Sequence, residues 1–116
     1  MPKTPEQVGK EHGRYSPAAY RFVYEGLGYT LQKLGHTGHV TGQTLCHGLL
    51  ALALDRWGKL ALTVLNSWGI HTTRDFGQIV WALIQNQLMT AQPGDSIDDF
   101  NNAYDLKAAI TAAFRF

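Results

Sequence analysis

The chain is divided by helix start and stop signals, and this division constrains its fold more than any other feature of the sequence. Ser16-Pro17 has the form of a helix start, because serine accepts hydrogen bonds from free first-turn amides and proline has no amide to satisfy. Gly35 has the form of a helix stop, since glycine adopts the left-handed conformation freely. Thr41 and Gly58 bracket a second segment in the same way. These signals predict one helix between Ser16 and Gly35 and another between Thr41 and Gly58.

Two further helices are predicted before residue 90. A third helix is expected from Leu60, with Gly69 as its left-handed stop. The fourth starts at Thr72 or Thr73, where Thr72 and Asp75 have the spacing of a capping box. Because that motif satisfies free amides of the first turn, we expect Thr72 to contribute more to stability than Thr73.

The spacing of apolar residues indicates which helix faces are buried. In the fourth helix apolar side chains recur every three or four residues from Phe76 onward, so Phe76 is expected in the core. Gln78 and Gln85 then fall on the solvent side. The segment from Thr41 to Trp57 is apolar over more than half its circumference, which is typical of the central helix of a small bundle.

The two ends of the chain carry weaker signals. Ser96 and Asp105 are expected to start two short helices. Residues 1–14 are polar and are expected to form a loosely held N-terminal arm, with a short turn of helix after Thr4-Pro5. We therefore predict a single all-α domain over residues 15–116, a compact bundle of four main helices plus short C-terminal helices. A winged-helix-like α+β domain with a small ribbon is the alternative fold.

Composition and charge exclude several classes of protein. A chain of 116 residues can bury a core without disulfides or metals, and the single Cys46 cannot form an internal disulfide. The longest uncharged run is too polar for a membrane span, and no signal-peptide pattern is visible, so we expect a cytoplasmic protein that does not contact membranes. The net charge of +1 is far from the basic footprint of a dedicated nucleic-acid binder.

Several spaced blocks between Tyr15 and Tyr104 resemble a small family of uncharacterised bacterial proteins, a domain of unknown function. The blocks are Tyr20-x-Phe22-Val23, His39-Val40-Thr41-Gly42-Gln43-x-Leu45-Cys46, Val64-Leu65-x-x-Trp68-Gly69-Ile70 and Thr73-x-Asp75-Phe76-Gly77-x-Ile79-Val80. This family has no assigned activity, so the resemblance supplies neither a function nor catalytic residues. It also implies extra apolar surface, because the relatives carry more charge where this chain has His47, Leu50 and Leu62.

Histidine and cysteine suggest a metal site at first sight. Four potential zinc ligands fall within twelve residues of one another: His36, His39, Cys46 and His47. Their spacing argues against a site, because adjacent helical residues point about a hundred degrees apart. We expect loop histidines and a buried cysteine instead.

No catalytic group is predicted. Cys46 or Ser67 could act with a histidine and Asp75, but neither nucleophile lies in a strand-turn-helix elbow. The Asp75-Phe76-Gly77 triplet is similar to the metal-binding tripeptide of kinases, yet it lies inside a helical pattern in a chain too short to be a kinase. We therefore expect no enzyme activity and no cofactor.

A helix-turn-helix regulator that binds nucleic acid is the first alternative function. The second, third and fourth helices have the outline of that motif, with the fourth as the reading helix. Its outward side chains include four that can hydrogen-bond base edges: Arg74, Gln78, Gln85 and Asn86. Only one of them is basic, whereas phosphate contacts dominate affinity, so this alternative is weakly supported.

We prefer a non-enzymatic helical domain that acts in protein–protein interaction or regulation, with a protein partner or as a homo-oligomer. The reason is the surplus of apolar side chains on the second helix, which includes Leu50, Leu54 and Trp57. A small-molecule-binding domain is the remaining alternative. Its pocket would be lined by aromatic residues: Tyr20, Tyr24, Trp57, Trp68 and Trp81.

Overall fold

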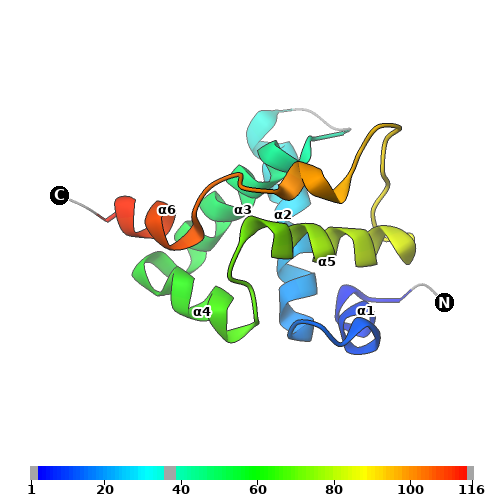
Figure 1. Cartoon of the computed structure of the whole chain (residues 1–116), viewed down its shortest axis with the longest axis horizontal. Helices are drawn as coiled ribbons and strands as arrows, with labels where there is room; N and C mark the ends of the chain where they lie inside the picture. Colours follow the sequence, from blue (N-terminus) through cyan, green and yellow to red (C-terminus); the bar gives the residue numbers. More distant parts are fainter. Residues whose placement is uncertain (1–2, 36–38, 115–116) are drawn as a thin grey trace.

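The computed structural model describes residues 3–35 and 39–114, and these segments are all-α (Figure 1). Within them lie six α-helices and two short 3-10 helices. They are α1 (Pro5–His12), α2 (Pro17–Leu34), α3 (Gly42–Trp57), η1 (Gly58–Leu60), α4 (Ala61–Ser67), α5 (Thr73–Gln85), η2 (Ile97–Phe100) and α6 (Leu106–Ala112). These residues form no strand, so the alternative fold with a small ribbon has no support.

The helix ends lie where the sequence signals predict them. Thr41 begins α3, and its side-chain oxygen accepts a hydrogen bond of 3.1 Å from the Thr44 amide. Gly35 ends α2 with a φ of 75°, and Gly69 follows α4 with a φ of 93°, both in the left-handed region. Ser16 precedes α2 as predicted, but its side chain makes no capping hydrogen bond.

The N-terminal segment has a helix where a helical turn is predicted after Thr4-Pro5, but it is packed against the protein rather than loosely held. Thr4 and Gln7 form a capping box that starts α1, and this helix packs against α2 and α5. Val8 is only 1% exposed. Gly9 is also buried, because the Tyr20 ring occupies the space that a side chain would need. A short helix with one apolar residue is therefore enough to fix this segment to the body of the protein.

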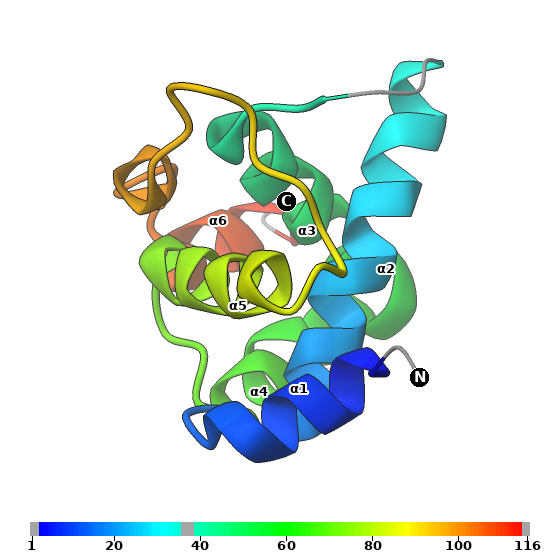
Figure 2. The same ribbon diagram turned by 90° about the vertical axis from the view of Figure 1, so that its right-hand side faces the viewer.

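The helices cross rather than run parallel. In Figure 2, α2 spans the height of the molecule with α1 beside its lower part, and Figure 1 shows α5 passing across α2. Helix α3 contacts α2, α4, α5 and η2, which agrees with the central place predicted for it. Trp57 and Trp68, at the ends of α3 and α4, pack around Phe22, with ring centroids 5.2 and 5.8 Å from its ring. No helix in the described parts of the chain has both the length and the apolar character needed to cross a membrane.

Helices α2 and α3 approach closely at two glycines. A Cβ atom on Gly26 would lie 2.2 Å from a methyl group of Leu49, and one on Gly48 would lie 1.8 Å from the Thr30 hydroxyl oxygen. Thr30 is itself buried and donates a 2.7 Å hydrogen bond to the Gly26 carbonyl. The contact thus interlocks the two helices by placing a side chain of each against a glycine of the other.

We predict that Gly48→Ala destabilises the protein by about 1–3 kcal/mol, the usual range for overpacking. Removing the clashing hydroxyl in a Gly48→Ala/Thr30→Ala variant should recover part of that loss. Gly28→Ala is the matched control, since nothing lies within 4 Å of a Cβ there. It should raise stability by about 0.5–1 kcal/mol through helix propensity. Urea unfolding measures all three, and equal effects at Gly28 and Gly48 would contradict the described helix crossing.

Candidate functional site

A cavity of about 400 Å³ lies between α2, the start of α3, α5, η2 and the segment from Leu88 to Asp95. Its volume is within the range of ligand sites in proteins, roughly 300–1,000 Å³. Sixteen residues line it, namely Leu27, His39, Val40, Thr41, Gly42, Leu45, Val80, Trp81, Ile84, Leu88, Met89, Thr90, Gln92, Asp95, Asp99 and Phe100. No lysine or arginine is among these described lining residues.

The lining of the cavity contains apolar and polar residues. Three helices contribute aliphatic side chains to the wall, and Leu45 and Val80 among them are buried in the core. Trp81 and Phe100 add aromatic surface, with their rings edge to face at a centroid distance of 6.2 Å. The polar residues include two carboxylates, Asp95 and Asp99. An apolar wall with a few polar groups is the usual composition of a ligand-binding pocket.

Phe100 forms one wall of the cavity by packing between two helices. A Cβ on Gly77 of α5 would lie 2.9 Å from the Phe100 Cβ, and a Cβ on Gly42 of α3 would lie 3.0 Å from the Phe100 ring. Both helices therefore present bare backbone to Phe100, which is 3% exposed. The triplet Asp75-Phe76-Gly77 has a structural explanation here, because its glycine admits this ring.

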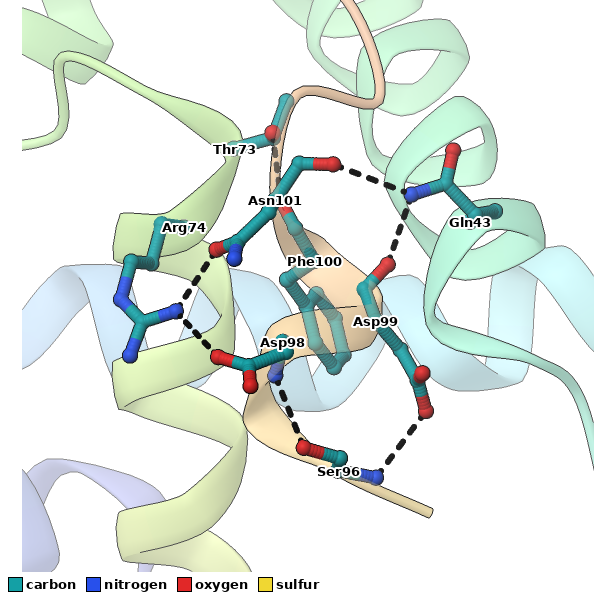
Figure 3. A network of polar contacts seen from close by, with 8 residues as sticks. All are labelled: Gln43, Thr73, Arg74, Ser96, Asp98, Asp99, Phe100 and Asn101. Atoms are coloured by element: carbon teal, nitrogen blue, oxygen red, sulfur yellow. Dashed lines mark hydrogen bonds and ion pairs between the residues drawn. The ribbon is translucent and has the colours of Figure 1, made fainter. Parts of the chain in front are cut away.

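Polar contacts fix η2 in this position (Figure 3). The buried Thr73 hydroxyl donates a 2.7 Å hydrogen bond to the Phe100 carbonyl and accepts one of 3.2 Å from the Ala103 amide. On the other side the Gln43 amide donates to the backbone carbonyls of Asp99 and Asn101, at 2.7 and 3.4 Å. Helices α5 and α3 thus each hold the backbone of η2 with one side chain.

The ends of η2 are held by charged groups. Ser96 and Asp99 form a capping box, in which the Asp99 carboxylate accepts a 3.0 Å hydrogen bond from the Ser96 amide. Arg74 of α5 donates to the carboxylate of Asp98 at 2.8 Å and to the side-chain oxygen of Asn101 at 2.7 Å. Because Arg74 is engaged in this way, it ties η2 to α5.

Asp95 lies in the wall of the cavity. One of its oxygens accepts a 2.8 Å hydrogen bond from the Gln92 amide, and the other lies 3.2 Å from the His39 ring nitrogen Nε2. The side chain is largely covered, with 22% of its surface exposed. The pair joins the segment before α3 to the segment before η2, so it links two parts of the lining that are far apart in the chain.

A second polar contact positions the start of α5. The Asp75 carboxylate accepts hydrogen bonds from the Tyr15 hydroxyl at 2.6 Å and from the amides of His71 and Thr72 at 2.8 and 3.0 Å. Burial alone raises the pKa of Asp75, but these hydrogen bonds outweigh burial and hold its pKa below the ordinary value. Burial and the neighbouring Asp75 carboxylate both raise the pKa of Tyr15. The capping box predicted for Thr72 and Asp75 is confirmed.

The histidines and the cysteine are not brought together. Cys46 is fully buried, which raises the pKa of its thiol to about 12, and its carbonyl accepts a 2.6 Å hydrogen bond from Tyr104. His47 is exposed beside the Tyr104 ring, and His39 faces Asp95. His36 lies outside the described residues. In the segments 3–35 and 39–114, no three His, Cys, Asp or Glu side chains are grouped closely enough to hold a metal ion.

The suggested nucleophiles are engaged in other contacts. The Ser67 hydroxyl donates a 2.6 Å hydrogen bond to the Val64 carbonyl of its own helix. Since a buried thiol with a raised pKa is a poor nucleophile, Cys46 is equally unsuited to attack a substrate. Neither residue makes a hydrogen bond to Asp75, whose partners are named above.

The predicted nucleic-acid residues do not form one free face. Arg74 is paired with Asp98, and Gln78 is half-buried on the same helix. Gln85 is exposed, whereas the Asn86 side chain donates a 2.8 Å hydrogen bond to the Ala82 carbonyl. Helix η2 packs on α5 and places the carboxylates of Asp98 and Asp99 beside it.

The predicted interaction residues and the predicted aromatic pocket are also placed differently. Leu50, Leu54 and Trp57 are half-buried and pack against the core, so they do not form the exposed surplus that we expected. Of the five aromatic residues, only Trp81 lines the cavity. Tyr20 is fully buried, and Tyr24 is 43% exposed. Sequence reasoning missed Phe100 and the aliphatic lining. The available signal was a glycine within each of two helical patterns, Gly42 and Gly77, because glycine there costs helix stability.

Comparisons with models of protein families, with curated proteins and with solved structures found no match to this chain.

We predict that Thr73 matters more than Thr72, which reverses the order expected from the sequence. Thr73 is 1% exposed, and losing its hydroxyl leaves the Phe100 carbonyl and the Ala103 amide without this partner. Thr73→Val, which keeps the shape, should lower the free energy of unfolding by about 1–3 kcal/mol. Thr73→Ser retains the hydroxyl and should lose less, and Thr72→Ala should lose about 1 kcal/mol. A larger loss at Thr72 than at Thr73 in urea unfolding would contradict the network in Figure 3.

The lowered pKa of Asp75 predicts a pH dependence of stability. A carboxyl whose folded pKa is below its unfolded value stabilises the protein above the unfolded pKa, about 3.9, and this stabilisation is lost as the pH falls through the folded value. The wild type should therefore exceed Asp75→Asn in stability at pH 7, and the difference should shrink below about pH 4. Asp55→Asn, at an exposed site, is the control and should show little difference at either pH. A constant gap between wild type and Asp75→Asn down to pH 2.5 would refute this account.

Proposed function

We propose that this chain is a non-enzymatic helical interaction domain whose cavity receives apolar side chains from a segment of a partner protein. The observation that carries the proposal is the apolar cavity, which η2 and its contacts hold between α2, α3 and α5. Both carboxylates of its lining already make contacts within the protein. Asp99 caps η2, while Asp95 is held by the Gln92 amide and faces His39.

The surface beside the cavity favours a protein segment over a small molecule. Leu27 lines the cavity, and Leu31 and Leu34 follow it on the same face of α2 at spacings of four and seven residues. Leu34 is 48% exposed, which is rare for a leucine in this protein. The rise of a helix places Leu34 about 10 Å beyond Leu27. An apolar strip of this length suits the repeated anchors of an amphipathic helix better than one compact ligand.

The remaining properties of this protein are part of the same proposal. We propose that α2, α3, α4 and α5 act as a bundle of four main helices, that the chain is cytoplasmic, and that it belongs to the uncharacterised bacterial family that its sequence blocks resemble. Binding of nucleic acid by α5 is supported less well, since Arg74 is engaged with Asp98.

We expect neutral side-chain analogues, N-acetyl-leucinamide and N-acetyl-phenylalaninamide, to bind the cavity weakly. Titration followed by amide chemical shifts should move residues that line the cavity, such as Leu45, Ile84 and Leu88. Ile84→Trp places a larger ring in the cavity and should weaken binding at least tenfold. Gln85→Trp is the control, because Gln85 is exposed on the same helix and does not line the cavity.

Three results would count against this proposal. Unchanged binding in Ile84→Trp would place the binding site elsewhere, as would shifts confined to residues remote from the cavity. The absence of any shift at millimolar analogue would show that the cavity does not accept apolar side chains. Sedimentation of the free protein tests a second copy as the occupant, and a concentration-dependent dimer abolished by Ile84→Trp would replace the separate partner with this chain itself.

A further inference from the structure

The cavity is apolar inside and has a negative charge at its polar side. Asp95 and Asp99 are among its lining residues, and Asp98 lies next to them on η2. Of these three carboxylates, Asp98 is paired with Arg74, whereas Asp95 and Asp99 have no lysine or arginine partner among the described ion pairs. A ligand with a positive charge at this side of the cavity would be attracted by these two carboxylates.

The neighbouring basic group of α2 does not cancel this charge. Lys33 lies near the end of α2, but its ammonium group sits over the Tyr29 ring at 5.3 Å from the centroid. Lys33 and Leu27 are six residues apart, which places them on different faces of the helix. In the lining, the His39 ring nitrogen Nε2 lies 3.2 Å from one oxygen of Asp95.

We propose that the partner segment is a basic amphipathic helix, with leucine-like anchors in the cavity and along Leu31 and Leu34, and with lysine or arginine beside Asp95 and Asp99. This inference rests on the proposed function and adds the charge and the secondary structure of the partner. The apolar strip on α2 sets the anchor spacing, and the two carboxylates set the sign of the flanking charges. Their contribution is mainly to specificity and to the rate of association.

Three synthetic helical peptides test the charge. They share one stripe of leucines at positions i, i+4 and i+7 and carry lysine, glutamine or glutamate at the flanking positions. Binding to the full chain at pH 8 and low salt should follow the order lysine, glutamine, glutamate, with about a tenfold difference between the first and the last. Raising the salt concentration should narrow this range, because exposed charges are screened.

Variants of the protein separate charge from apolar contact. Asp95→Asn/Asp99→Asn keeps the oxygens that accept the amides of Gln92 and Ser96 and should reduce the tenfold preference to less than threefold. Asp55→Asn makes one similar change on α3, at an exposed site about 20 Å along the helix from its start, and should leave the preference unchanged. Ile84→Trp should weaken all three peptides equally.

The other possible outcomes distinguish a failure of this inference from a failure of the proposed function. If all three peptides bind equally and Ile84→Trp weakens them, the basic character of the partner is wrong and the interaction domain stands. If no peptide binds while N-acetyl-leucinamide does, the helical segment is wrong. If 4-phenylbutylamine binds as tightly as the lysine peptide, the occupant is a small amphipathic amine. If the Asp95→Asn/Asp99→Asn variant still prefers the lysine peptide, groups other than these two carboxylates recognise the positive charge and the inference is wrong.

Discussion

The cavity depends on one contact, the packing of Phe100 between Gly42 and Gly77. Glycine at both positions allows the ring to lie against the backbones of α3 and α5, where a Cβ would approach it to 3.0 Å or closer. Helix η2 has only four residues and could not hold a position by its own hydrogen bonds. It is instead fixed by the Phe100 ring, by Thr73 from one helix and by Gln43 from another. This wall of the cavity is therefore anchored to both α3 and α5.

This contact gives a physical role to sequence blocks that carry no recognisable chemistry. Within the block that starts at His39, Val40 lines the cavity, Thr41 caps α3, Gly42 admits Phe100 and Gln43 holds the η2 backbone. Within the block that starts at Thr73, the hydroxyl of Thr73 and the bare backbone of Gly77 do the same from α5. Between Thr73 and Gly77, Asp75 belongs to the capping box of α5 and Phe76 is buried in the core. Two distant stretches of the chain are thus specialised to receive a third, residues 96–103.

The helices could be predicted from the sequence, because caps and periodicity are local. Gly35, Thr41 and Asp105 act where the pattern places them, and Phe76 is buried as predicted. The site could not be predicted, because it is built from contacts between residues far apart in the chain. Thr73 follows an N-cap and reads as an exposed first-turn residue, yet η2 covers it. Periodicity cannot show which apolar stripe a neighbouring helix will cover, so it does not reveal that Leu50, Leu54 and Trp57 pack against the core.

The most direct test of this account is a nuclear Overhauser measurement on the protein without any ligand. Protons of Phe100 should show strong contacts to the α-protons of both Gly42 and Gly77, since the ring and its Cβ lie against both backbones. Contacts to both glycines would establish that the wall of the cavity is formed before a partner arrives. If neither contact is present, or if both appear only after an apolar ligand is added, η2 is not seated in the free protein and a preformed binding site is contradicted.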